Sequence, residues 1–241
     1  MIDWTPSDGS VGLAPSEIRV YRCSLDANPE ELTALARTLA AEEQERASRF
    51  FFSRDRDHFV KGRATLRSIL GKFLGVTPSE VPLCRGKHGK LHLDAQKGLP
   101  ALHFNLAHSH GLILYAFSFN GELGIDLEKI RADSTVAGSV SEFFAPAEKA
   151  AIEQSLQRGQ FELFYRCWVM KEAYTKARGE GLQIPLNSFA LPPAWPDCDW
   201  AGPAQLDGWA IAPFQPAPGY IAAFSIQLGL KAEVRFQDWL G

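Results

Sequence analysis

The stretch Leu123-Gly124-Ile125-Asp126-Leu127-Glu128 alternates apolar and acidic residues with the period of a β-strand. The alternation places the apolar side chains on one face and the carboxylates of Asp126 and Glu128 on the other. Carboxylates two residues apart lie about 7 Å from each other, since a strand rises about 3.3 Å per residue. Such a pair suits Mg²⁺, which takes one or two carboxylates and fills its shell with water and phosphate. The polar face of an edge strand is the alternative interpretation.

Regular elements are predicted on both sides of this strand. Phe104–His108 and Ile113–Phe117 favour a hairpin turning at Ser109-His110-Gly111. Long helices are predicted over Asp55–Leu74 and Gln160–Arg178, the second ended by Gly179. The shorter predictions are helix starts at Asn28–Glu31 and Ala145–Glu148, strands near Ser188–Leu191, Trp209–Ala212 and Tyr220–Ile226, and an irregular surface loop over Pro192–Pro203.

Helices precede a hairpin in each half of the chain, and short patterns recur. Phe50–Ser53 is echoed by Phe143–Pro146, and Tyr115–Ser118 by Ala222–Ser225. Two related α+β halves explain the echo, with an N-terminal half over 1–122 and a C-terminal half over 123–241. Chance similarity is the alternative explanation.

Charge is unevenly distributed along the 241 residues, whose net charge is −3. The stretch from Arg46 to Lys90 holds eleven basic and three acidic residues, so it carries +8 and the remainder −11. A basic block in an acidic chain indicates a compact anionic ligand, although a solvated helix face gives the same pattern. No nucleic-acid motif is present, so a nucleic-acid partner is not expected.

No membrane partner is expected either, because the longest apolar runs are far too short to span a bilayer. The first ten residues lack the features of a secretory signal. The four cysteines are scattered without CxxC spacing, which is typical of free thiols in a reducing compartment. A cytoplasmic location is therefore predicted.

The segment Trp168–Lys176 places Trp168, Glu172 and Lys176 four residues apart, hence on one helix face. With Asp126 and Glu128 available, Glu172 would complete a cluster of three carboxylates around a metal. Lys176, one turn further, would then meet a phosphate. A surface Glu–Lys pair beside a core tryptophan is the alternative.

Two further segments favour anion binding. Arg85-Gly86-Lys87-His88-Gly89-Lys90 sets glycines between cations, which lets the backbone approach an anion closely; an exposed basic turn is the alternative. In Asn105–His110, a phosphate-binding His108 fits the neighbouring basic block. A buried structural histidine and a transition-metal pair of His108 with His110 are the alternatives.

These blocks, in this order, resemble the surfactin-type (Sfp-type) 4′-phosphopantetheinyl transferases. The family signatures are a Phe-Asn-Ile/Leu-Ser-His-Ser strand, a Gly-Ile-Asp-Ile/Leu-Glu strand and a Trp-x-x-Lys-Glu-Ala-x-x-Lys helix. Here they stand as Phe104–Ser109, Gly124–Glu128 and Trp168–Lys176. Glu45-Arg46, Gly62-Arg63, Leu66-Arg67 and Phe143-Phe144-x-x-x-Glu148 also match, so the resemblance runs from about Glu45 to Ile226.

The resemblance implies two similar α+β halves related by a pseudo-twofold axis, with coenzyme A in the cleft between them. It implies a Mg²⁺-dependent transfer of phosphopantetheine from coenzyme A to a serine of an acyl or peptidyl carrier protein, releasing 3′,5′-ADP. A monomer is expected, since the halves form a pseudo-dimer within one chain.

Residue roles also follow from the resemblance. Asp126 and Glu172 would be the principal metal ligands, with Glu128 a third. Glu172, Lys176 and Asp126 form the expected catalytic set, in which Lys176 meets the diphosphate and Glu172 accepts the serine proton. Trp168 would pack behind the site, and Glu148 would help to shape it. The expected coenzyme A contacts are Arg46, Arg85, Lys87, Lys90, Asn105, His108, Ser109 and Lys176.

One position departs from the family pattern, because Ala107 stands where the family usually has serine. A lost neutral hydrogen bond is worth about 0.5–1.5 kcal/mol, so weaker coenzyme A binding is expected without loss of function. Two other functions use the same residue types. A Mg²⁺-dependent hydrolase of a nucleotide diphosphate needs no carrier, and a non-catalytic binding module would not need its metal ligands.

Overall fold

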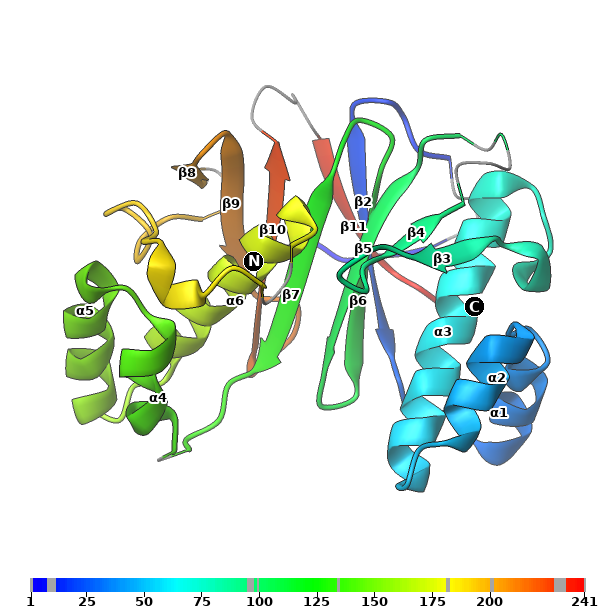
Figure 1. Ribbon diagram of the computed structural model, residues 1–241, viewed down its shortest axis with the longest axis horizontal. Coiled ribbons are helices and arrows are strands. Elements are labelled where there is room, and N and C mark those ends of the chain that lie inside the picture. The colour runs from blue at the N-terminus through cyan, green and yellow to red at the C-terminus, as the bar shows by residue number, and fades with distance from the viewer. Residues whose placement is uncertain are drawn as a thin grey trace.

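The computed structural model describes residues 2–7, 12–94, 98, 100–133, 135–180, 183–199, 202–227 and 233–240. Two sheets form its centre, and a long helix packs against each of them (Figure 1). The α+β class predicted from the sequence is confirmed. None of the helices in these ranges is long and apolar enough to cross a membrane.

The first sheet contains strands from both ends of the chain. Its order is β1 (Thr5–Pro6), β11 (Glu233–Asp238), β2 (Glu17–Ser24), β6 (Leu112–Ser118) and β5 (His103–Ser109). β11 runs parallel to both β1 and β2, and the other pairs are antiparallel. The last strand therefore joins the sheet of the first half, and the predicted boundary at residues 122 and 123 stays a prediction.

The second sheet is antiparallel, in the order β7 (Leu123–Lys129), β10 (Tyr220–Gln227), β9 (Trp209–Phe214) and β8 (Ala204–Leu206). A separate hairpin pairs β3 (Leu83–Arg85) with β4 (Leu91–Leu93). The α-helices are α1 (Pro29–Ala36), α2 (Ala41–Ser48), α3 (Ser53–Leu74), α4 (Thr135–Phe143), α5 (Pro146–Gln157) and α6 (Glu162–Arg178).

The helix boundaries follow the capping chemistry of the sequence. The Asn28 side chain accepts a hydrogen bond from the backbone N–H of Glu31 at 2.8 Å, which confirms the predicted helix start. α3 ends at Gly75 and α6 at Gly179, with φ of 69° and 74°. Glycine adopts these left-handed values without the cost that a Cβ brings.

The strand predicted near Ser188–Leu191 is wrong. A 3₁₀ turn occupies Leu186–Ser188, and the short strand of this region is β8, which the sequence analysis missed. The Lys171 ammonium donates to the carbonyls of Leu186 and Phe189 at 2.7 and 2.6 Å. These carbonyls are satisfied by a buried cation rather than by a neighbouring strand.

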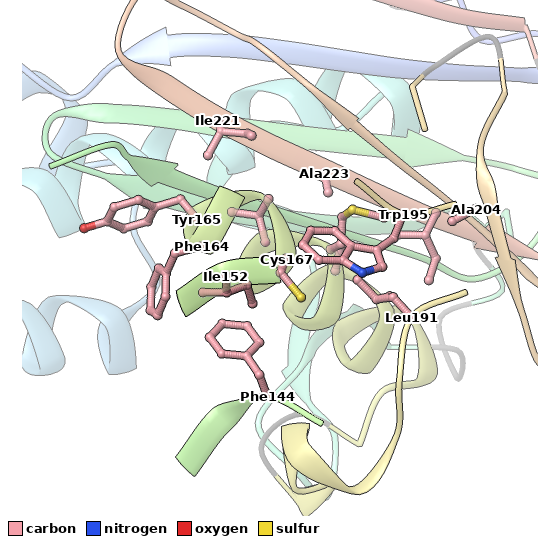
Figure 2. Close-up of a cluster of buried hydrophobic side chains, with 14 of the residues drawn as sticks. Phe144, Ile152, Phe164, Tyr165, Cys167, Leu191, Trp195, Ala204, Ile221 and Ala223 are labelled. Atoms are coloured by element: carbon pink, nitrogen blue, oxygen red, sulfur yellow. The ribbon is translucent and has the colours of Figure 1, made fainter. Parts of the chain in front are cut away.

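The proline-rich stretch Pro192–Pro203 is irregular where the structure describes it, but it is not confined to the surface. Trp195 is 3% exposed and Cys198 6% exposed. Figure 2 shows Trp195 and Leu191 in the same apolar cluster as Cys167 of α6. The loop therefore closes the core of the second half.

The two sheets meet through apolar faces and through two adjacent strands. Ile18 and Leu114 of the first sheet share a buried cluster with Ile125 and Phe224 of the second. β5 lies beside β7, where the Asn105 side chain accepts a hydrogen bond from the Ile125 N–H at 2.9 Å. The junction of the halves thus carries the predicted site residues.

Candidate active site at the junction of the two halves

Gly124 sets the distance between β7 and α6. A Cβ at this position would lie 2.1 Å from the Ala173 carbonyl oxygen and 2.4 Å from the Ala177 nitrogen. Only a residue without a side chain lets the helix backbone rest directly on the strand. This contact brings the polar face of β7 against Glu172 and Lys176 of α6.

Asp126 and Lys176 form an ion pair across this contact. The Lys176 ammonium lies 2.5 Å from Asp126 Oδ1, and Asp126 is 6% exposed. Burial alone would lower the pKa of Lys176, but the charge of Asp126 and its hydrogen bond raise it above its ordinary value. Burial raises the pKa of Asp126, and Lys176 opposes that rise. The site therefore holds a charged lysine against a carboxylate that is costly to bury alone.

Glu172 and Glu128 stand beside this pair. Burial raises the pKa of both carboxyls, and the charge of Asp126 raises each further. Glu128 accepts a hydrogen bond from the Ser109 hydroxyl at 2.8 Å. The predicted alternation of β7 is thus confirmed, because Asp126 faces α6 while Ile125 and Leu127 lie in the apolar cluster.

The carboxylates offer oxygen ligands of the kind that Mg²⁺ prefers. Asp126 Oδ2 and Glu172 Oε1 are buried and have no hydrogen-bond partner. Two free carboxylate oxygens fit a small divalent cation that takes its other ligands from water and phosphate. Across the described ranges, however, no three His, Cys, Asp or Glu side chains are placed so that they could hold a metal.

A cavity of about 940 Å³ opens beside this cluster, a size suited to a large small-molecule ligand. Glu172 and Lys176 line it on one side, with Asn105 and His108 of β5. Partial burial and the charges of Lys176 and His58 lower the pKa of His108. The cations that line it from the basic block are Arg46, Arg54, Arg63, Arg85 and Lys90.

Arg63 lines the cavity, although the sequence analysis matched it to the family pattern without giving it a role at the site. It is 9% exposed, and its Nη1 is buried without a hydrogen-bond partner. Burial lowers the pKa of Arg63 to about 10. The charge of Glu43 opposes this shift, and the positive charges of Arg85 and Arg46 add to it. Four arginines concentrated in one cavity favour an anion carrying more than one charge.

Two lysines of the predicted anion-binding loop differ in position. Lys90 lines the cavity, but its ammonium is bound to Glu122 at 2.6 Å and to the Leu123 carbonyl at 3.2 Å. It therefore also ties the β3–β4 hairpin to β7. Lys87 is exposed and does not line the cavity, whereas the adjoining His88 and Gly89 do.

Three residues of β5 contact the second sheet, either by hydrogen bonds to β7 or by apolar packing. Besides Asn105, Ser109 is bonded to β7, since its hydroxyl also accepts from the Lys129 N–H at 3.2 Å. Ser109 does not line the cavity. Ala107 is 5% exposed and lies in the apolar cluster between the sheets, so the expectation that a hydroxyl here would contact the ligand has no structural support.

Trp168 and Glu148 lie in the core of the second half. Trp168, one turn before Glu172 on α6, packs edge-on against Phe143, with ring centroids 5.0 Å apart. Glu148 is fully buried, pairs with Lys171 at 2.9 Å and accepts from the Leu191 N–H at 2.7 Å. Neither residue lines the cavity.

Comparison with known proteins gives a consistent result over most of the chain. Residues 25–119 match the family model described as 4′-phosphopantetheinyl transferase, N-terminal, and residues 122–206 match the 4′-phosphopantetheinyl transferase superfamily. The chain is 34% identical over 224 residues to the 4′-phosphopantetheinyl transferase HetI of a Nostoc species, covering 92% of this chain and 93% of that protein. It is 26% identical to the 4′-phosphopantetheinyl transferase Sfp of Bacillus subtilis, covering 90% and 91%.

Proposed function

The chain belongs to the 4′-phosphopantetheinyl transferase superfamily, and from that premise we propose a role for each part of its cleft. It is a transferase that moves phosphopantetheine from coenzyme A to a carrier protein. The observation that carries the residue roles is the β7–α6 contact, which brings Asp126 against Lys176 and thus beside a cationic cavity that Glu172 and Lys176 line.

The basic side of the cavity binds the phosphates of coenzyme A. Arg46, Arg63 and Arg85 repel one another in the free protein, and an anion between them would relieve that repulsion. His108 lines the same cavity near Lys176, so it adds a further nitrogen to the ligand-binding wall. Lys90 closes the same wall from the β3–β4 hairpin.

Mg²⁺ would be held by Asp126 and Glu172, whose unpartnered buried oxygens provide the ligands. Glu128 would join them through Oε1, since its Oε2 accepts the hydrogen bond from Ser109. When bound, the cation would polarise the diphosphate and neutralise charge on its oxygens. Lys176, which pairs with Asp126 Oδ1 and lines the cavity, would bind the diphosphate beside the cation.

In the transfer, the serine oxygen of the carrier forms a bond to the phosphorus that bears the pantetheine. The bond from that phosphorus to the bridging oxygen breaks, and 3′,5′-ADP leaves with the electron pair. Glu172 lines the cavity, so it would accept the serine proton. Lys176 stabilises the charge that develops on the leaving oxygen.

Intact mass measurement of an apo acyl or peptidyl carrier protein tests the proposal. With coenzyme A and Mg²⁺, the carrier gains one phosphopantetheine, and its serine-to-alanine variant gains nothing. Cleavage of coenzyme A without any gain of mass would identify a hydrolase instead. A monomeric state and a cytoplasmic location stay predictions of the same proposal.

A further inference from the structure

Two phenylalanines form an exposed aromatic patch at the start of α3. Phe51 is 91% exposed and Phe52 64%, and Leu240 is the one other large hydrophobic side chain exposed among the described residues. The two rings contact each other edge to face, with centroids 4.9 Å apart. Single exposed apolar residues need no explanation, but a contacting pair forms a patch that a partner can cover.

This patch lies at the rim of the cavity. Phe50 and Arg54, the neighbours of the pair in the sequence, both line the cavity. In Figure 1 the N-terminal end of α3, the β5–β6 turn and the C-terminal end of β7 all point toward the lower edge of the view. A protein that delivers a side chain into the cavity from this side would meet Phe51 and Phe52 first.

Exposed cations from both halves surround the same rim. Partial burial, followed by the positive charges of Arg131, Lys129 and Arg54, lowers the pKa of His110 in the β5–β6 turn. All three cations are exposed, and none forms an ion pair within the described ranges. Arg54 comes from α3, whereas Lys129 is the last residue of β7 and Arg131 follows that strand.

The acidic residues at this rim are aspartates, whose side chains are shorter than those of the cations. Asp55 lines the cavity, and Asp26 lies near the β5–β6 turn, where His58 is its 3.9 Å neighbour. The rim therefore keeps an excess of positive charge around an apolar centre. Such a surface favours an acidic partner that also presents apolar side chains.

We propose that Phe51, Phe52, Arg54, Lys129 and Arg131 form the docking surface for an acidic carrier protein, with apolar side chains beside its acceptor serine covering the two phenylalanines. This inference rests on the proposed transferase function and adds the residues that recognise the second substrate. The surface spans both halves, so a docked carrier bridges the mouth of the cavity and directs its serine inward. Coenzyme A, which binds inside the cavity, does not need the aromatic pair.

The test is steady-state transfer to an apo carrier at saturating coenzyme A and Mg²⁺, for Phe51→Ala/Phe52→Ala and for Arg131→Glu. Each variant should raise the KM for the carrier at least tenfold, because central aromatic anchors dominate the affinity of such contacts and a reversed rim charge slows association. The KM for coenzyme A and kcat should stay at the wild-type values. Leu240→Ala and Arg158→Glu are matched controls, since both residues are exposed and lie outside this rim.

Binding of the serine-to-alanine carrier, measured by calorimetry, provides a second readout without turnover. Weaker binding by the aromatic variant than by the Leu240 control supports the docking surface. An unchanged carrier KM, or an equal rise in the KM for coenzyme A, would overturn it. Failure of the transferase function itself is separate, because the wild-type protein would then modify no carrier.

Discussion

The ammonium of Lys176 lies 2.5 Å from Asp126 Oδ1, while the second oxygen of the same carboxylate is buried without a partner. Asp126 of β7 thus binds the Lys176 ammonium through Oδ1 and keeps Oδ2 free to ligate a metal. Glu172, one turn before Lys176, adds another unpartnered oxygen. In the free protein, two carboxylates therefore face the single positive charge of Lys176.

Asp126→Asn should reduce transfer at least about a hundredfold, because it removes charge from the proposed Mg²⁺ ligand at nearly constant size. It should also abolish the rise in Tm that Mg²⁺ gives by binding the folded state. Thermal unfolding with and without Mg²⁺ measures this effect. Glu153→Gln, on an exposed position of α5, is the matched control. Wild-type turnover at saturating Mg²⁺ would remove Asp126 from the metal site.

Gly124→Ala should destabilise the protein by about 1–3 kcal/mol, since the new Cβ would overlap the backbone of Ala173 and Ala177. The strain should push α6 away from β7. The rate of transfer by the folded variant should therefore also fall, in addition to the loss in free energy of unfolding. Gly138→Ala, in α4 with open space around its Cβ position, should be neutral or slightly stabilising. Urea unfolding compares the two; an equally stable Gly124 variant would contradict the close contact.

The sequence predicts β7 and α6 well, because β7 alternates with a period of two and α6 has a clear end at Gly179. It does not predict how closely they pack, which depends on the meeting of Gly124 with Ala173, residues far apart in the chain. The pairing of β11 with β2 is not predicted for the same reason, since no local pattern encodes a partner some two hundred residues away.

Burial also decides which polar residues serve the site. Arg63 is one cation among many in the basic block, and only the fold shows that it lines the cavity and has an unpartnered Nη1. Ser109 and Asn105 have the chemistry of ligand contacts, but both are bonded to β7. A motif gives the residue type that a site needs, whereas the direction of each side chain depends on the neighbouring strand.

Glu122→Gln should lower stability at neutral pH. A hydrogen bond from His103, opposed by burial and supported by Lys90, lowers the pKa of Glu122 from 4.5 to about 2. A carboxyl with a lowered pKa in the folded protein stabilises it above pH 4.5, and this contribution is lost as the pH falls toward 2. The Tm difference between wild type and variant should thus shrink between these values. A constant difference across that range would contradict the assignment.

Lys171→Met should destabilise the protein by about 3–5 kcal/mol, because Glu148 would stay buried with an uncompensated charge. Lys171→Met combined with Glu148→Gln should recover part of the loss, since the charge is then removed as well. Chemical unfolding of both variants measures this coupling. Unchanged stability together with lost transfer would instead place Glu148 in the active site, as the family resemblance implied.

Arg46→Ala should weaken binding of coenzyme A at least about tenfold, since a charge-assisted contact is worth about 1.5–3 kcal/mol. Arg46 is exposed at the cavity, stacks over the ring of Phe59 at 5.2 Å and lies close enough to Arg63 to repel it. If this group holds the 3′-phosphate, the variant should bind dephospho-coenzyme A as the wild type does. Calorimetry with both ligands separates the two contributions, and Arg158→Ala serves as the exposed control. Equal losses for both ligands would place Arg46 on the diphosphate instead, whereas no loss for either would remove it from the cavity's binding group.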